Sequence, residues 1–312
     1  MTNPENGLPS ALTATDGRSI QIKQWLPDDE PRAVVLILHG LSEHSARYER
    51  FAKAATANGL GVVTYDHRGH GPAVPAGTPA HFGDTGGWDA VVNDVGVVVG
   101  AVRSTITGVP VVVLGHSMGS YIAQSALMRG TADVDALILS GSTSPNRAEV
   151  RIARGLAWLI STFAGAASPA RLLNTVSFGK FNDAFKPNRT EFDWLSRDPT
   201  EVDKYADDPH CGQLASNRLW FDLLGGLLEI STPTSIAHLP ETLPVLITGG
   251  TLDPVGGASG MTRLRDNYVA AGLADVSLKL YPEGRHEMLN ETNRDHVSAD
   301  LLAWIDARLT SA

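Results

Sequence analysis

Cysteine is almost absent from this chain, because Cys211 is the only one among 312 residues. A single cysteine excludes an internal disulfide and a metal cluster built from cysteines. Long apolar runs are missing as well. The longest nearly apolar stretch, residues 152–167, contains Arg154 and is too short to cross a bilayer. We therefore expect no membrane-spanning segment.

Positive charge is also scarce. The chain has 25 Lys and Arg against 34 Asp and Glu, which gives a net charge of -9. This balance argues against nucleic-acid partners and against electrostatic docking on anionic lipid. Residues 1–10 lack the basic and apolar regions of a signal peptide, so we expect a soluble, cytoplasmic protein. With 43% hydrophobic residues, the chain can bury one large core, with or without an insertion.

One stretch of the chain carries the strongest chemical signal. Val111 to Leu114 are apolar and mostly β-branched, which predicts a buried strand. Gly115-His116-Ser117-Met118-Gly119 follows directly, and a helix is then expected as far as Gly130. A serine between two glycines on a strand-to-helix turn is typical of a nucleophile elbow, in which the turn presents the hydroxyl at the edge of a sheet.

Apolar strands and helices alternate on both sides of this stretch, which predicts a parallel sheet with helices on both faces. The alternation stops from about residue 143 to residue 231, where two apolar helical stretches flank a polar, aromatic-rich segment. We therefore expect a core of residues 1–142 and 232–312, interrupted by a helical cap at 143–231. Strands are expected at residues 33–38, 61–65, 111–114, 134–139, 243–248 and 276–281, with a hairpin at 12–25.

A serine nucleophile needs a base, and the base needs a carboxylate that orients it. Asp253 and His286 each follow a predicted strand, so with Ser117 they fall at the same carboxyl edge of the sheet. The order Ser, Asp, His is the order of a hydrolase triad on an α/β sheet. Negative charge in the transition state needs two N–H donors, and we assign these to Met118 and to Leu41 in the loop after the strand at 33–38.

Two further histidines, His67 and His70, are candidate metal ligands. No additional ligands stand at a zinc-type spacing, so a hydrogen-bonded structural loop is favoured and no metal ligand is assigned. His116 is interpreted as a packed histidine rather than a base, and Cys211 as inert.

Several motifs together resemble the monoacylglycerol lipase and lysophospholipase branch of the α/β-hydrolases. They are His39-Gly40-x-x-Glu43-His44-Ser45-x-Arg47-Tyr48, Asp66-His67-Arg68-Gly69-His70-Gly71, the Ser117 pentapeptide and Arg285-His286-Glu287. The resemblance covers nearly the whole chain. It implies the α/β-hydrolase fold, a triad of Ser117, Asp253 and His286, and an oxyanion hole at Leu41 and Met118. It also implies that Glu43 and Arg47 lie near the alcohol end of the substrate pocket. Pro72-Ala73 departs from the family pattern without touching a catalytic position.

The insertion is expected to set substrate size. Leu156, Ile160 and Phe163 share one helical face, and Leu224 belongs to a second apolar stretch. One interpretation is a cap that packs on the core. The other is an acyl-chain tunnel lined by these four residues, with an outer apolar patch that contacts lipid aggregates transiently.

The sequence thus predicts a serine hydrolase that cleaves esters of single-chain lipids and needs no cofactor. Its expected partner is a small ester or single-chain lipid, and not a nucleic acid. A short-chain carboxylesterase or lactonase with a closed cap, or a thioesterase, remains an alternative enzyme. A ligand-binding receptor on a hydrolase fold is the alternative outside enzymes.

Overall fold

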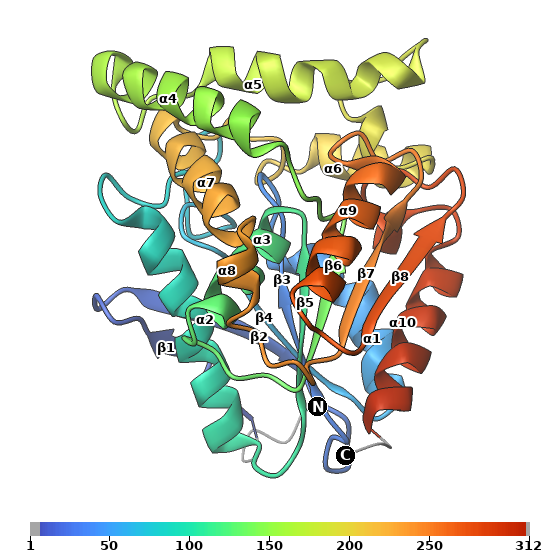
Figure 1. Ribbon diagram of the computed structural model, residues 1–312. Coiled ribbons are helices and arrows are strands. Elements are labelled where there is room, and N and C mark those ends of the chain that lie inside the picture. Colours follow the sequence, from blue (N-terminus) through green and yellow to red (C-terminus); the bar gives the residue numbers. More distant parts are fainter. Residues whose placement is uncertain (1–6, 310–312) are drawn as a thin grey trace.

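The computed structural model describes residues 7–309 and is built around one eight-stranded sheet (Figure 1). The strand order is β1-β2-β4-β3-β5-β6-β7-β8. β1 and β2 pair antiparallel, as do β2 and β4, and all other neighbours are parallel. The strands are β1 (Ala11–Thr13), β2 (Ser19–Trp25), β3 (Val34–Leu38), β4 (Gly61–Tyr65), β5 (Val111–His116), β6 (Ala136–Ser140), β7 (Val245–Gly250) and β8 (Val276–Tyr281).

Helices cover both faces of this sheet, as the alternating pattern predicted. The helical elements are η1 (Ser45–Tyr48), α1 (Glu49–Ala57), α2 (Gly87–Thr105), α3 (Met118–Met128), α4 (Arg147–Ala164), α5 (Arg171–Ser177), η2 (Phe178–Phe185), η3 (Asp193–Leu195), α6 (Pro199–Asp207), α7 (Asn217–Ile230), α8 (Pro233–Ile236), α9 (Gly257–Ala270), η4 (Met288–Asn290) and α10 (Arg294–Leu309). This arrangement is the α/β-hydrolase fold.

The core divides along the two faces of the sheet because successive strand side chains point in opposite directions. In β3, Val34, Leu36 and Leu38 join the cluster that includes residues of α2, α3 and α9. Val35 and Ile37 join the other cluster, with residues of α1 and α10. Burial on both faces explains why these strands are continuous apolar runs.

The chain between β6 and β7 holds helices and no strand within its described part. α4 packs on α7, and α7 in turn packs on α2 and α3. In Figure 1, α4 and α5 lie at one end of the molecule, above the sheet. Across residues 7–309, no helix combines the length and the apolar character needed to span a membrane.

Candidate active site

Ser117 stands between β5 and α3 with a backbone φ of 51° and ψ of -120°. A non-glycine residue rarely takes a positive φ, and this strained turn is held in place by its surroundings. The Ser117 N–H donates to the Ser140 carbonyl at 2.8 Å. The flanking glycines are needed for space: a Cβ on Gly115 would lie 2.6 Å from the Cα of Ser120, and one on Gly119 would collide with the backbone of Leu38. This is the backbone geometry expected of a nucleophile elbow.

The loop after β3 runs beside this elbow. A Cβ on Gly40 would lie 3.3 Å from the Cβ of Ser117, which shows how closely the two segments approach. Leu41 follows Gly40 in this loop and lines the same cavity as Ser117. Met118 is the first residue of α3, so its N–H has no acceptor within the helix. Two backbone segments thus meet at Ser117, in the arrangement that an oxyanion hole requires.

His286 and Asp253 are brought together from the loops that follow β8 and β7. The Nδ1 atom of His286 lies 2.9 Å and 3.0 Å from the two carboxylate oxygens of Asp253. Both side chains are buried, with 3% and 4% of each residue exposed. Burial acts to lower the pKa of His286, but the Asp253 carboxylate outweighs it, and the pKa is raised above the ordinary value of 6.5.

A cavity of about 520 Å³ opens at this edge of the sheet, and both Ser117 and His286 line it. Its apolar wall comes from Leu41, Phe192, Trp194, Leu195 and Tyr205. Amide and hydroxyl side chains form another part of the wall: Ser42, Asn174, Thr175, Asn182, Asn188, Thr190 and Gln213. A volume of this size is in the range of small-molecule sites, roughly 300–1,000 Å³.

The four apolar residues predicted to line an acyl-chain tunnel lie on α4 and α7. Leu156 and Phe163 are exposed on α4, with 84% of Phe163 accessible to solvent. Ile160 packs partly against the core, and Leu224 is buried within it. None of the four lines the cavity that contains Ser117. α4 packs on α7, and Leu224 belongs to α7 itself.

Glu43 and Arg47 form a buried ion network beside the cavity. Glu43 lines the cavity, but Arg47 does not. The Arg47 guanidinium contacts both carboxylate oxygens of Glu287 and also Glu43 at 2.8 Å. Glu43 accepts the N–H of Gly40 and the hydroxyl of Tyr48. Although burial acts to raise it, Arg47 lowers the pKa of Glu43 to about 2. This network joins the loop after β3 to the residue that follows His286.

Four other histidines of the motifs are buried: His39, His67, His70 and His116. The rings of His39 and His67 are tilted toward each other with their centroids 4.3 Å apart, and burial lowers the pKa of both. Burial lowers the pKa of His70 to about 3 and that of His116 to about 4, so these rings are neutral at physiological pH. The ring nitrogens of His67 and His70 are not part of a three-ligand group in residues 7–309.

Comparison with known proteins assigns the chain to a family. The family model described as "Serine aminopeptidase, S33" matches residues 29–293. The chain belongs to this family. A monoacylglycerol lipase of Mycolicibacterium smegmatis is 32% identical to this S33-family chain, covering 96% of it and 97% of the relative. The human monoglyceride lipase is 27% identical, covering 99% of this chain and 93% of the relative.

Solved structures give the same fold for this S33-family chain. A structure described as a lipase in its open form superposes with a TM-score of 0.85 at 27% identity, covering 96% of this chain and 98% of that one. A thermostable carboxyl esterase of Bacillus coagulans, in complex with glycerol, has a TM-score of 0.83 at 24% identity, covering 96% and 97%. The latter likeness shows the α/β-hydrolase fold.

Sequence reasoning missed the cavity wall that α5, η2 and η3 of this S33-family chain supply. Trp194 is the clearest case, because its ring centroid lies 5.1 Å from that of His286. The neighbouring Leu195 carbonyl accepts the N–H of Glu287 at 2.8 Å. The only signal was compositional, since this part of the insertion is rich in aromatic and amide residues without a helical period.

Proposed function

We propose that this chain hydrolyses the esters of monoacylglycerols through an acyl-enzyme intermediate on Ser117. It is a carboxylic ester hydrolase. The observation that carries the proposal is the single cavity into which Ser117 and His286 both open, with Asp253 hydrogen-bonded to the far side of the His286 ring. The relatives named monoacylglycerol lipase and monoglyceride lipase support the substrate class.

The catalytic cycle follows from this arrangement. The Ser117 hydroxyl oxygen attacks the ester carbonyl carbon, and Nε2 of His286 takes the hydroxyl proton. The N–H groups of Leu41 and Met118 stabilise the oxyanion. His286 then gives the proton to the departing alcohol, which leaves the acyl group on Ser117. Water attacks this acyl-enzyme with His286 again as base, and the fatty acid departs. Asp253 keeps the Nδ1 proton in place throughout.

The mixed lining of the cavity supports a substrate with one apolar and one polar part. Leu41, Phe192 and Trp194 offer an apolar surface for an acyl chain. The amides of Asn174, Asn188 and Gln213 offer hydrogen-bonding groups for a glycerol headgroup. We therefore assign the substrate-binding role to this wall instead of to the α4 face.

We further propose that the helical insertion, residues 143–231, acts as a cap that meets lipid aggregates. Its outer surface carries exposed apolar side chains on α4 and α5: Ile152, Leu156, Trp158, Leu159, Phe163, Leu172 and Val176. Exposed apolar residues gathered in this way are typical of a lipid-contacting or partner-contacting surface.

Hydrolysis rates on a series of monoacylglycerols and simple esters test this function. We expect the wild-type enzyme to prefer monoacylglycerols over acetyl esters, and Ser117→Ala to abolish turnover. Asp253→Asn should lower kcat by roughly ten-thousandfold, as the equivalent change does in a serine protease, because the imidazole loses its correct tautomer. Circular dichroism checks that both variants are folded. A rate that peaks on two- to four-carbon esters would replace this substrate class with the short-chain esterase alternative.

A further inference from the structure

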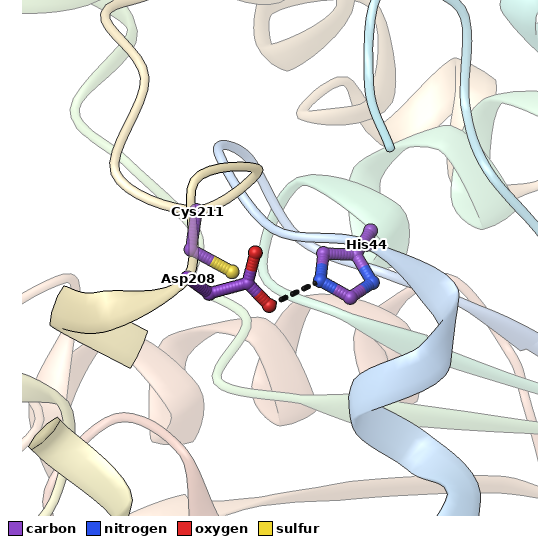
Figure 2. Close-up of side chains that lie close together, drawn as sticks. All are labelled: His44, Asp208 and Cys211. Atoms are coloured by element: carbon purple, nitrogen blue, oxygen red, sulfur yellow. Dashed lines mark hydrogen bonds and ion pairs between the residues drawn. The ribbon is translucent and has the colours of Figure 1, made fainter. Parts of the chain in front are cut away.

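Three side chains with metal-binding atoms converge outside the catalytic machinery (Figure 2). His44 follows the loop after β3, whereas Asp208 and Cys211 follow α6 in the helical insertion. One ring nitrogen, one carboxylate oxygen and the Sγ atom all lie within 4.8 Å of one another. In Figure 2 the carboxylate and the sulfur both turn toward the imidazole. We propose that these three residues bind a Zn²⁺-type transition-metal ion.

The donor set selects the class of ion. Zn²⁺ prefers thiolate, imidazole and carboxylate ligands, whereas Mg²⁺ and Ca²⁺ take oxygen ligands. Three protein ligands leave one position of a tetrahedral ion for water. The sequence could exclude a cluster of cysteines but not this mixed site, because His44 and Asp208 are 164 positions apart.

The separations are close to those that an ion requires. His44 Nε2 lies 2.8 Å from the Asp208 Oδ2 atom, joined by a hydrogen bond. Two ligands of a tetrahedral Zn²⁺ at about 2.0–2.2 Å from the metal stand roughly 3.3–3.6 Å apart. The pair therefore has to open by less than about 1 Å, and the ion takes the place of the shared proton. The proton that a neutral His44 shares from Nε2 moves to Nδ1, which frees Nε2 to bind the ion, and the Cys211 thiol releases its proton to water.

The backbone holds the two insertion ligands on a fixed turn. Asp208 accepts the His210 N–H on its Oδ1 atom at 2.8 Å, and its carbonyl accepts the Cys211 N–H at 3.0 Å. The ring centroids of His210 and His44 lie 6.4 Å apart. The buried Nδ1 atom of His210 has no hydrogen-bond partner within the described residues. The Asp208 side chain is 29% exposed, which leaves a route from solvent.

Metal binding here would clamp the insertion to the loop that carries Leu41. The two segments already meet at Ser42, whose carbonyl accepts the Gly212 N–H at 2.9 Å and the Tyr205 hydroxyl at 2.8 Å. An ion bound only by the folded chain stabilises that fold in proportion to its occupancy. The site uses neither Ser117 nor His286, so it stands independently of ester hydrolysis.

Co²⁺ is the probe for this site, because cobalt reports thiolate ligation by a near-ultraviolet charge-transfer band. Titration of the wild-type protein with CoCl₂ should give the band at one ion per chain, and ZnCl₂ should displace it, while MgCl₂ should not. Cys211→Ser should abolish the band. Asp208→Asn should weaken Co²⁺ binding by at least about tenfold. Loss of a residue that only hydrogen-bonds to a metal ligand already lowers metal affinity by about this factor.

Two matched variants serve as controls. Ser117→Ala should bind Co²⁺ as wild type does, which separates this proposal from the proposed function. His296→Ala removes an exposed histidine that pairs with Asp300 at 3.4 Å on α10, and should also leave the band unchanged. The proposal is overturned by absence of the band at saturating Co²⁺ in folded wild-type protein, or by an equal band in Cys211→Ser. If Cys211→Ser fails to fold, unchanged affinity in Asp208→Asn overturns it.

Discussion

His286 receives its electrostatic environment from carboxylates that lie far apart in the sequence. Asp253 contacts its ring directly, and Glu287 and Glu43 add to the field that raises its pKa. Arg47 sits between these two glutamates, so their charges are partly balanced while their positions are fixed. The protonation of the base therefore depends on the loop after β3 as well as on its own loop.

The pH dependence of turnover tests this environment. His286 must be neutral to accept a proton, so kcat should rise with pH and its inflection should lie above the ordinary histidine value of 6.5. Glu287→Gln removes a negative charge that favours the protonated ring, so its inflection should move to lower pH. The pH profile of kcat for both proteins measures this shift. An inflection below 6.5 in wild type, or an unmoved one in Glu287→Gln, would contradict the account.

At the level of elements, local patterns predicted the sheet, but not the packing partners of the helices between β6 and β7. β3 to β7 are largely apolar runs, and β8 alternates apolar with polar residues, so their positions could be read directly. The period of α4 shows that one face is apolar, yet periodicity does not say what covers that face. The wall around Trp194 is built from short helices and loops, for which the sequence has no periodic signal. Long-range pairs such as His44 with Asp208 leave no local trace either.

A substitution at Phe163 on α4 tests whether this residue lines the substrate cavity or belongs to an outer surface that contacts lipid. Because its side chain is largely exposed, Phe163→Asp should leave kcat/KM for a dissolved short ester unchanged within about twofold. The affinity of this variant for lipid vesicles should fall by roughly 10- to 100-fold, because that factor corresponds to the free energy of burying one phenylalanine side chain. Vesicle co-sedimentation and ester kinetics measure the two effects. Val269→Asp, an exposed apolar residue on α9, should change neither. An equal loss in both assays of Phe163→Asp would restore the tunnel interpretation.

The whole molecule combines an eight-stranded sheet with helices between β6 and β7 that contribute to the cavity at one edge of the sheet. β5 supplies Ser117, the loops after β7 and β8 supply Asp253 and His286, and the insertion closes the cavity with η3. Hydrogen bonds tie the insertion to the core at Ser42 and at Glu287. The position of the insertion is therefore coupled to both sides of the proposed reaction.

The central claim is that Ser117 is the nucleophile of an ester hydrolase. Its most direct measurement is peptide mass spectrometry of the protein after reaction with a fluorophosphonate, combined with turnover of a monoacylglycerol in the same sample. The account predicts a single adduct on the peptide that contains Ser117, with turnover lost in proportion to labelling. An adduct on a different residue, or full turnover after complete labelling of Ser117, would contradict it.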